Sequence, residues 1–189
     1  MNFIRNDKVN MIHVKNIKKE INPFYKNLLK ECENQRPAFL ENVKLDPHFE
    51  GNNFYLKTEH TRSLYNLMLK ECRKLLNKFT LKDDNFKCWC YFSDKYFNYY
   101  KKPSTLWHNH KTTSTINGVV YLKINKNNKG IDFNIKKKKV NFKPKQFDLF
   151  IFPSYLEHCP YPSKNEESRI TLNLELRCDE NPESIFRTV

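Results

Sequence analysis

The hydrophobic positions of the chain follow two different periods. In residues 22–32 and 60–79 they recur every three or four residues, which is typical of amphipathic helices that cover another part of a protein. The apolar stripe of the second segment consists of Leu64, Leu67, Met68, Cys72, Leu75, Leu76 and Phe79. Residues 35–56 lie between these segments and contain Pro37, Pro47 and Gly51, so we expect irregular chain there with at most one short strand.

From Phe86 onward the pattern changes to short apolar runs separated by turn residues. The runs are FKCWCYFS, WHNH, INGVVYLKI, GIDFNI, VNFKP, DLFIFPS and RITLNLEL. Many short strands in succession favour a sandwich or barrel, and a jelly roll fits best because its two sheets bring residues from non-adjacent strands to one mouth. We therefore predict an α+β fold in which a cupin-like double-stranded β-helix over residues 86–177 is supported by mainly helical residues 1–82.

Length and composition favour one domain over residues 1–189, since the chain has no internal repeat and no Gly/Ser-rich linker. It contains no run of 18 apolar residues, and its start does not resemble a signal peptide. We expect a cytoplasmic protein without a membrane partner. The six cysteines include no CxxC pair, because Cys88 and Cys90 are separated by one residue, and we expect reduced thiols.

The formal net charge of +13 raises the question of a nucleic-acid partner. The lysines are scattered, however, and the one continuous run, residues 136–139, lies between two apolar runs as a solvated hairpin tip would. Alanine occurs once, at Ala38, whereas Lys, Asn, Phe and Tyr abound, which is typical of an AT-rich genome. A nucleic-acid partner is compatible with this charge but is not indicated by it, and the oligomeric state stays open.

The candidate chemistry begins with the histidines of WHNH. Side chains alternate between the two faces of a strand, so His108 and His110 would point the same way and could hold one metal ion together. His158 follows 48 residues later and could supply a third ligand from a distant strand. Three protein ligands on one side of a metal leave the other side open for substrate and dioxygen, which favours an oxidative iron enzyme.

The segment 143–176 makes this hypothesis more specific. It contains a proline-led turn, an apolar strand ending in FPS, His158 four residues beyond Ser154, and Arg169 eleven residues after His158. This arrangement resembles the C-terminal half of the 2-oxoglutarate- and Fe(II)-dependent oxygenases. The run INGVVYLKI is similar to the SGVYYL-type strand of the small phage and bacterial branch of that superfamily. The resemblance covers about residues 89–176.

The resemblance implies a set of roles. His108, His110 and His158 would hold Fe(II), and Arg169 would pair with the distal carboxylate of the co-substrate 2-oxoglutarate, assisted by the hydroxyl of Thr171. Tyr121 is a candidate contact of the keto acid. The activity implied is that of a dioxygenase, by default a hydroxylase of an unknown substrate, with no catalytic residue beyond the metal ligands.

One residue departs from the family pattern, and it leaves alternatives open. Position 110 usually carries a carboxylate, so His110 implies a three-histidine site, an open iron position with His110 on the substrate, or a carboxylate supplied from elsewhere. Glu157 is a poor source, because it would face away from His158. Arg169 could instead pair with Glu166 or Glu175.

Two other classes of protein stay open as well. A cupin-like metal protein would lack the keto acid, and a basic nucleic-acid-binding protein would lack catalysis. The remaining histidines, His13, His48 and His60, are expected to be ordinary polar residues.

Overall fold

The computed structural model describes residues 2–6 (backbone), 11–45, 55–82, 86–93, 107–124, 128–160 and 169–187. The elements, in chain order, are β1 (Asn2–Asn6), β2 (Met11–Lys15), α1 (Lys18–Ile21), α2 (Tyr25–Leu45), α3 (Glu59–Leu75), β3 (Lys87–Ser93), β4 (Ile116–Lys123), β5 (Ile131–Ile135), β6 (Lys138–Phe142), β7 (Leu149–Pro153), β8 (His158–Pro160), β9 (Arg169–Leu176) and α5 (Pro182–Phe186). None of the described helices is long and apolar enough to span a membrane.

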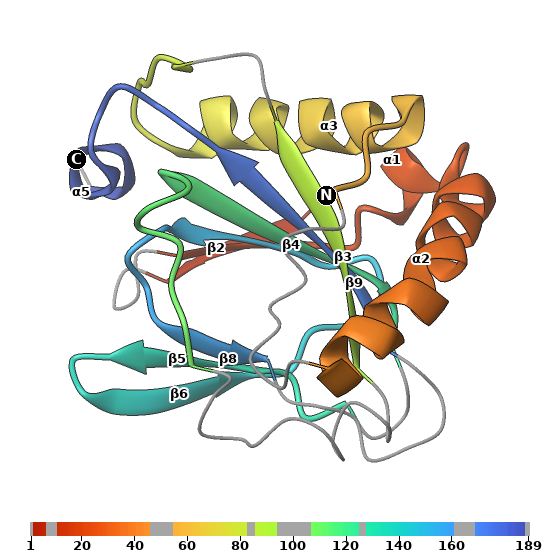
Figure 1. Cartoon of the computed structure of the whole chain (residues 1–189). Helices are drawn as coiled ribbons and strands as arrows, with labels where there is room; N and C mark the ends of the chain where they lie inside the picture. The colour runs from red at the N-terminus through yellow and green to blue at the C-terminus, as the bar shows by residue number, and fades with distance from the viewer. Residues whose placement is uncertain are drawn as a thin grey trace.

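The strands form two antiparallel sheets that face each other (Figure 1). The large sheet has the order β1-β2-β7-β4-β9-β3 and the small sheet the order β6-β5-β8. From β4 to β9 the chain passes from the large sheet to the small one and back twice. As a result, β4 lies between β7 and β9, and β5 lies beside β8. This is the predicted jelly-roll arrangement, with open sheets and flanking helices, and the predicted fold class is confirmed.

The strands of the large sheet separate two apolar layers. Val120 and Leu122 of β4 pack in the core cluster that also contains Leu64 and Met68 of α3, whereas Val119 and Tyr121 belong to a second cluster between the sheets. Figure 1 shows α3 lying along the outer face of the large sheet. Gly118 permits this close approach, because a Cβ atom there would overlap the sulfur of Met68. The inner face carries the second cluster together with buried polar residues of β9 such as Thr171.

The structure corrects the expectation for the N-terminal region. Helix α2 continues through Pro37 to Leu45, where irregular chain was expected. A proline inside a helix costs about 3 kcal/mol or more, but Pro37 is exposed and Phe39 is fully buried beside Phe92, with ring centroids 5.2 Å apart. We attribute the continuation of the helix to this tertiary packing, which overrides the local signal.

Strands β1 and β2 were not predicted either; β2 pairs with β7 and β1 with β2, so that both extend the large sheet. The second half of the irregular segment, residues 46–54, lies outside the described residues, and Tyr55 forms an isolated bridge with Trp89. The single-domain boundary stays a prediction.

Smaller expectations are confirmed. Lys136 and Lys137 form the turn of the β5–β6 hairpin with positive φ angles of 49° and 64°, and both side chains are exposed. All six cysteines are free and buried.

Candidate metal centre

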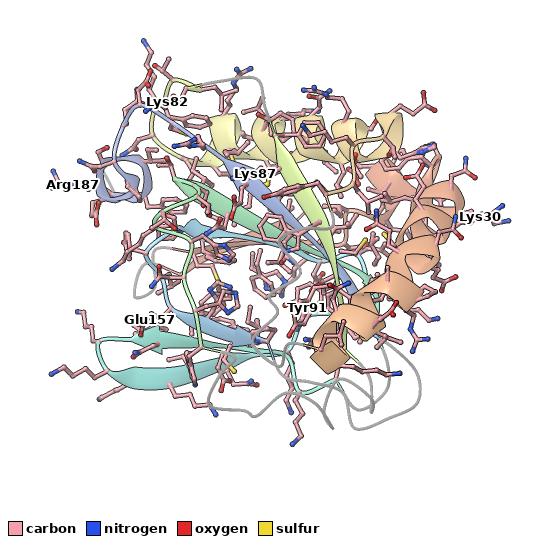
Figure 2. The ribbon with its side chains drawn as sticks, viewed as in Figure 1. Lys30, Lys82, Lys87, Tyr91, Glu157 and Arg187 are labelled. Carbon is pink, nitrogen blue, oxygen red and sulfur yellow. The ribbon has the colours of Figure 1, made fainter. Side chains whose placement is uncertain are left out.

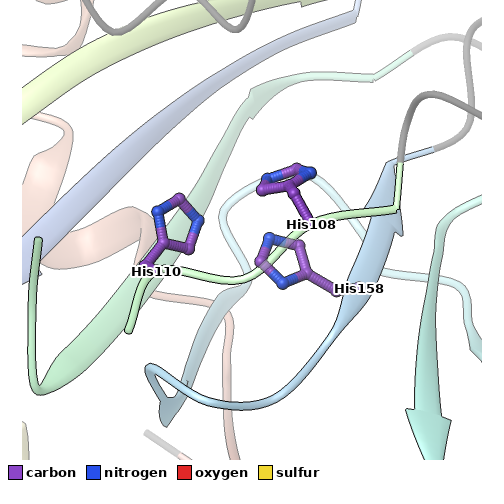
Figure 3. Close-up of side chains that lie close together, drawn as sticks. All are labelled: His108, His110 and His158. Carbon is purple, nitrogen blue, oxygen red and sulfur yellow. The ribbon is translucent and has the colours of Figure 1, made fainter. Parts of the chain in front are cut away.

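Three histidines from distant parts of the chain converge between the sheets (Figure 3). One nitrogen of each of His108, His110 and His158 lies within 4.8 Å of the others. The ring centroids are 4.3 Å apart for His108 and His158, 5.1 Å for His108 and His110, and 5.2 Å for His110 and His158. This spacing allows one small ion to be bound by all three rings.

Backbone hydrogen bonds hold the two histidine-bearing segments together. The N–H groups of His108 and His158 each donate to the carbonyl of the other, at 3.0 and 2.9 Å. The N–H of His110 donates to the Ser154 carbonyl at 2.8 Å. His108 therefore forms an isolated bridge and the chain turns directly after His110, so WHNH is not the regular strand that we expected, although both side chains reach the same place.

His158 is held as a neutral ligand. It is 3% exposed, and its Nδ1 atom lies 3.0 Å from the Leu156 carbonyl, which fixes Nδ1 as the protonated nitrogen. Burial, with the neighbouring His108 and His110, lowers the pKa of His158 well below its usual value. Its Nε2 lone pair is therefore available for a metal at neutral pH.

His110 is oriented by a carboxylate that the sequence did not single out as a site residue. Its Nδ1 atom lies 2.9 Å from Oε1 of Glu175 on β9, and the hydroxyl of Thr113 donates to the same oxygen at 2.8 Å. A hydrogen bond at Nδ1 directs Nε2 toward the other histidines. Strand alternation could have indicated Glu175, since it shares a face with Arg169.

Arg169 lies at the other end of the same face of β9. Its side chain is 2% exposed, and its Nη1 donates to Asn128 Oδ1 at 3.1 Å and to the Gly130 carbonyl at 3.0 Å. Its buried Nε has no hydrogen-bond partner, and in the described part of the chain no carboxylate pairs with it. Desolvation lowers its pKa from the usual value. The pairing with Glu175 that we considered is therefore wrong, and Glu166 lies outside the described residues.

Comparison with solved structures places this geometry in a known fold. A prolyl-4-hydroxylase from Pseudomonas putida matches 82% of this chain and 82% of its own, with 15% identity and a TM-score of 0.52. A prolyl 4-hydroxylase from Phytophthora capsici matches 96% of this chain and 68% of its own, with 13% identity and a TM-score of 0.61. The non-heme alpha-ketoglutarate-dependent carbocyclase SnoK of nogalamycin biosynthesis matches 93% and 83%, with 10% identity and a TM-score of 0.52.

The chain has the fold of these oxygenases. The resemblance noted in residues 89–176 is thus confirmed at the level of the fold. No protein-family model matches the sequence, and no curated protein does.

Within the oxygenase fold, Thr171 lies between Arg169 and Glu175 on the same face of β9, and Tyr121 of β4 lies beside it. They are register partners on β9 and β4 and are 4% and 1% exposed. Burial raises the pKa of the Tyr121 phenol, while Arg169 acts in the opposite direction. Tyr121 is therefore a neutral hydroxyl facing the interior, as a contact of a bound anion would need to be.

Other residues considered in the sequence have structural partners. Glu157 is exposed (Figure 2) and accepts a hydrogen bond from Asn134 Nδ2 at 2.8 Å, so it does not face the histidines, as expected. His13 pairs with Asp148 at 2.8 Å and His60 with Glu31 at 2.7 Å. His48 lies outside the described residues.

The basic side chains gather elsewhere in the described part of the molecule. A groove of about 680 Å³ is lined by His13, Lys15, Lys143 and Lys145, and by none of the three clustered histidines. Other basic side chains, such as Lys30 and Arg187, extend outward from the periphery (Figure 2). Among the described residues, Arg169 is the buried cation on the face of β9 that also carries Glu175.

Proposed function

We propose that this protein is a 2-oxoglutarate- and Fe(II)-dependent dioxygenase that holds its iron with His108, His110 and His158 and hydroxylates a C–H bond of an organic substrate. The donor set suits the metal, because imidazole nitrogens bind iron and three ligands leave room for a chelating keto acid and dioxygen. Bound Fe(II) would supply the activation of dioxygen, of which one oxygen atom would go to 2-oxoglutarate, giving succinate and carbon dioxide, and the other to the substrate C–H bond, giving a hydroxyl group.

The observation that carries the proposal is the buried guanidinium of Arg169, which no carboxylate of the described residues compensates. A buried charge is stable only when it is paired or well hydrogen-bonded, and Arg169 has two neutral oxygen acceptors and an unused Nε. An anionic ligand would complete this site. A planar guanidinium can bind both oxygens of a carboxylate.

The separation of the two sites fits one ligand. His158 is paired with Phe133 across β8 and β5, and Gly130, which Arg169 contacts, lies three residues before Phe133. Three residues of strand span about 10 Å. A five-carbon dicarboxylate could therefore chelate the metal at one end and pair with Arg169 at the other, with Thr171 and Tyr121 along its length.

The apolar surroundings would keep water from the metal. Phe152 and Phe133 contact the His158 ring, with centroid distances of 4.9 and 5.9 Å, and both phenylalanines are fully buried. Electrostatic contacts of a bound keto acid are stronger in such surroundings than in water. The chain thus supplies ligands, an anion anchor and a dry interior.

Anaerobic titration with Fe(II) and 2-oxoglutarate tests the proposal, because keto-acid chelates of Fe(II) give a visible charge-transfer band. We expect the band with the wild type, and its loss or weakening at equal ligand concentration in Arg169→Ala. Arg177→Ala is the control, since Arg177 is exposed just beyond β9. Metal binding without the band in the wild type would instead indicate a cupin-like metal site. Absence of metal binding would favour a basic binding protein.

A further inference from the structure

Glu175 is a carboxylate that the protein buries without fully satisfying it. It is 3% exposed, and both of its polar contacts, with His110 Nδ1 and with the Thr113 hydroxyl, are made by Oε1. Its buried Oε2 has no hydrogen-bond partner among the described residues. Burial of an ionised carboxylate costs several kcal/mol of folding free energy unless a positive charge compensates it.

No lysine or arginine of the described residues compensates the Glu175 carboxylate, and the partner of its Oε1 atom that could transmit a positive charge is the His110 ring. Lys87 is the register partner of Glu175 on β3, but its ammonium group lies over the Tyr55 ring, 6.0 Å from the centroid. Asn117, the register partner on β4, accepts a hydrogen bond from Ser114 at 2.6 Å, and its own Nδ2 is unused. The missing positive charge is therefore expected beyond the His110 ring, where the three histidines converge.

We infer that Glu175 is a positioning residue that supplies, through His110, the negative charge that a carboxylate at position 110 would place directly on the metal. The inference rests on the proposed function. Three neutral imidazoles leave a bound Fe(II) site at +2, whereas the usual carboxylate ligand lowers it to +1. Glu175 restores the missing charge one imidazole ring away from the metal.

Two physical consequences follow for ligand binding. Glu175 holds the Nδ1 proton of His110 and makes Nε2 a stronger donor, as carboxylates behind ligating histidines do. Its charge also attracts the metal cation but repels the dianionic keto acid. Loss of the charge should therefore weaken metal binding without weakening the binding of 2-oxoglutarate to the metal-loaded protein, a combination that simple damage to the fold would not produce.

The test compares Glu175→Gln with Glu71→Gln by titration with Mn(II), and then with 2-oxoglutarate at saturating Mn(II). Glu71 is a matched control, because it is also 3% exposed and it forms an ion pair with Lys74, 3.9 Å away on the same helix. We expect Glu175→Gln to weaken Mn(II) binding about 10- to 100-fold. The affinity for 2-oxoglutarate should be equal or higher, and Glu71→Gln should change neither affinity.

The outcomes separate this inference from the proposed function. If the wild type binds neither Mn(II) nor 2-oxoglutarate, the proposed function is wrong. If the wild type binds both and Glu175→Gln binds Mn(II) within twofold of it, Glu175 has no such role. A parallel loss of both affinities would show that Glu175 only supports the fold, which also overturns the inference.

A second test moves the negative charge from Glu175 to position 110, so that the inference does not depend on a single variant. In His110→Asp the carboxylate would lie on the metal itself, so Glu175 would become a second, surplus buried charge. We expect Glu175→Gln to weaken Mn(II) binding in the wild-type background but to leave it unchanged or strengthen it in His110→Asp. Equal weakening in both backgrounds would contradict the relayed charge, because such a cycle isolates the coupling of the two positions.

Discussion

The two ends of β9 carry opposite buried charges on the same face of the strand. Among the described residues, Arg169 at the beginning is a cation with neutral acceptors only, whereas Glu175 near the end is an anion that contacts the His110 ring and the Thr113 hydroxyl and pairs with no lysine or arginine. Six residues separate them, about 20 Å of strand. The polar residues between them on this face are Thr171 and Asn173.

This arrangement differs from that of a stabilising ion pair. Had the two charges evolved to stabilise the protein, they would be close enough to neutralise each other, as Lys139 and Asp132 are at 2.6 Å. Their separation instead leaves each end to be neutralised by a ligand of opposite charge, an anion at Arg169 and a cation near Glu175. The two unpaired buried charges lower the free energy of unfolding of the ligand-free protein, and binding of the two ligands would raise it again.

The largest effect is expected from removal of a metal ligand. His158→Ala should abolish measurable Mn(II) binding, because two ligands remain and the buried ring between Phe133 and Phe152 is lost. His60→Ala is the control: it removes a partner of Glu31 and should lower stability without changing metal binding. Isothermal titration and circular dichroism would measure the two effects. Retained Mn(II) affinity in His158→Ala would place the metal elsewhere.

Replacement of the buried cation should have the next largest effect. Arg169→Met should weaken 2-oxoglutarate binding about 100-fold or more, since the partner of a buried carboxylate contributes several kcal/mol. In the absence of ligands the same variant should be as stable as the wild type or more stable, because an unpaired buried charge is replaced by an apolar side chain.

Thermal unfolding with and without Mn(II) and 2-oxoglutarate separates these effects of Arg169→Met. We expect the keto acid to raise the melting temperature of the metal-loaded wild type but not that of the variant. A ligand-free variant that is clearly less stable than the wild type would mean that Arg169 is mainly structural. Arg169 would then not be a buried charge that a ligand neutralises.

The positions of these charges show how far the sequence could predict the site. His158, Arg169 and Thr171 lie on or next to strands whose alternation is readable, and the His108–His110 spacing was informative even though the segment proved to be a bridge and a turn. Glu175 was on the predicted face too. Its partner is not deducible from local pattern, because the contact depends on how the turn after His110 packs against β9.

The fold was predictable to a similar extent. Periods of two and of 3.6 residues reflect local burial, and they indicated the jelly roll and helix α3. The passage of α2 through Pro37 depends on the burial of Phe39 against β3, and the β1–β2 extension depends on pairing with a strand more than 130 residues away. Both are products of tertiary contacts that a local pattern does not contain.

Asp148 provides a contrasting buried carboxylate, and its replacement should have an effect of intermediate size. Burial alone would raise its pKa, but hydrogen bonds from His13 and from the N–H groups of Lys145 and Asn16 lower it below the usual value. A lowered pKa means that the folded state is stabilised above the unfolded-state pKa and that this contribution is lost as pH falls through the folded-state pKa.

Asp148→Asn should accordingly lower the free energy of unfolding by about 2 kcal/mol at neutral pH, and the difference from the wild type should shrink as the pH falls below about 4. Urea unfolding over a pH series would measure it. Mn(II) affinity should not change, because Asp148 satisfies its charge outside the metal centre. A pH-independent difference would mean that packing, not charge, accounts for the loss.

The smallest effect is expected from Thr113→Val, which keeps the shape of the side chain and removes one hydrogen bond to Glu175. Loss of this bond should cost about 1 kcal/mol of unfolding free energy. Because the charge of Glu175 and its contact with His110 remain, Mn(II) affinity should fall much less than in Glu175→Gln. Measured side by side, the two variants separate the charge at this end of β9 from the hydrogen bonding that orients it. Equal losses of affinity would mean that orientation dominates, whereas a loss confined to Glu175→Gln would show that the charge itself stabilises the bound metal.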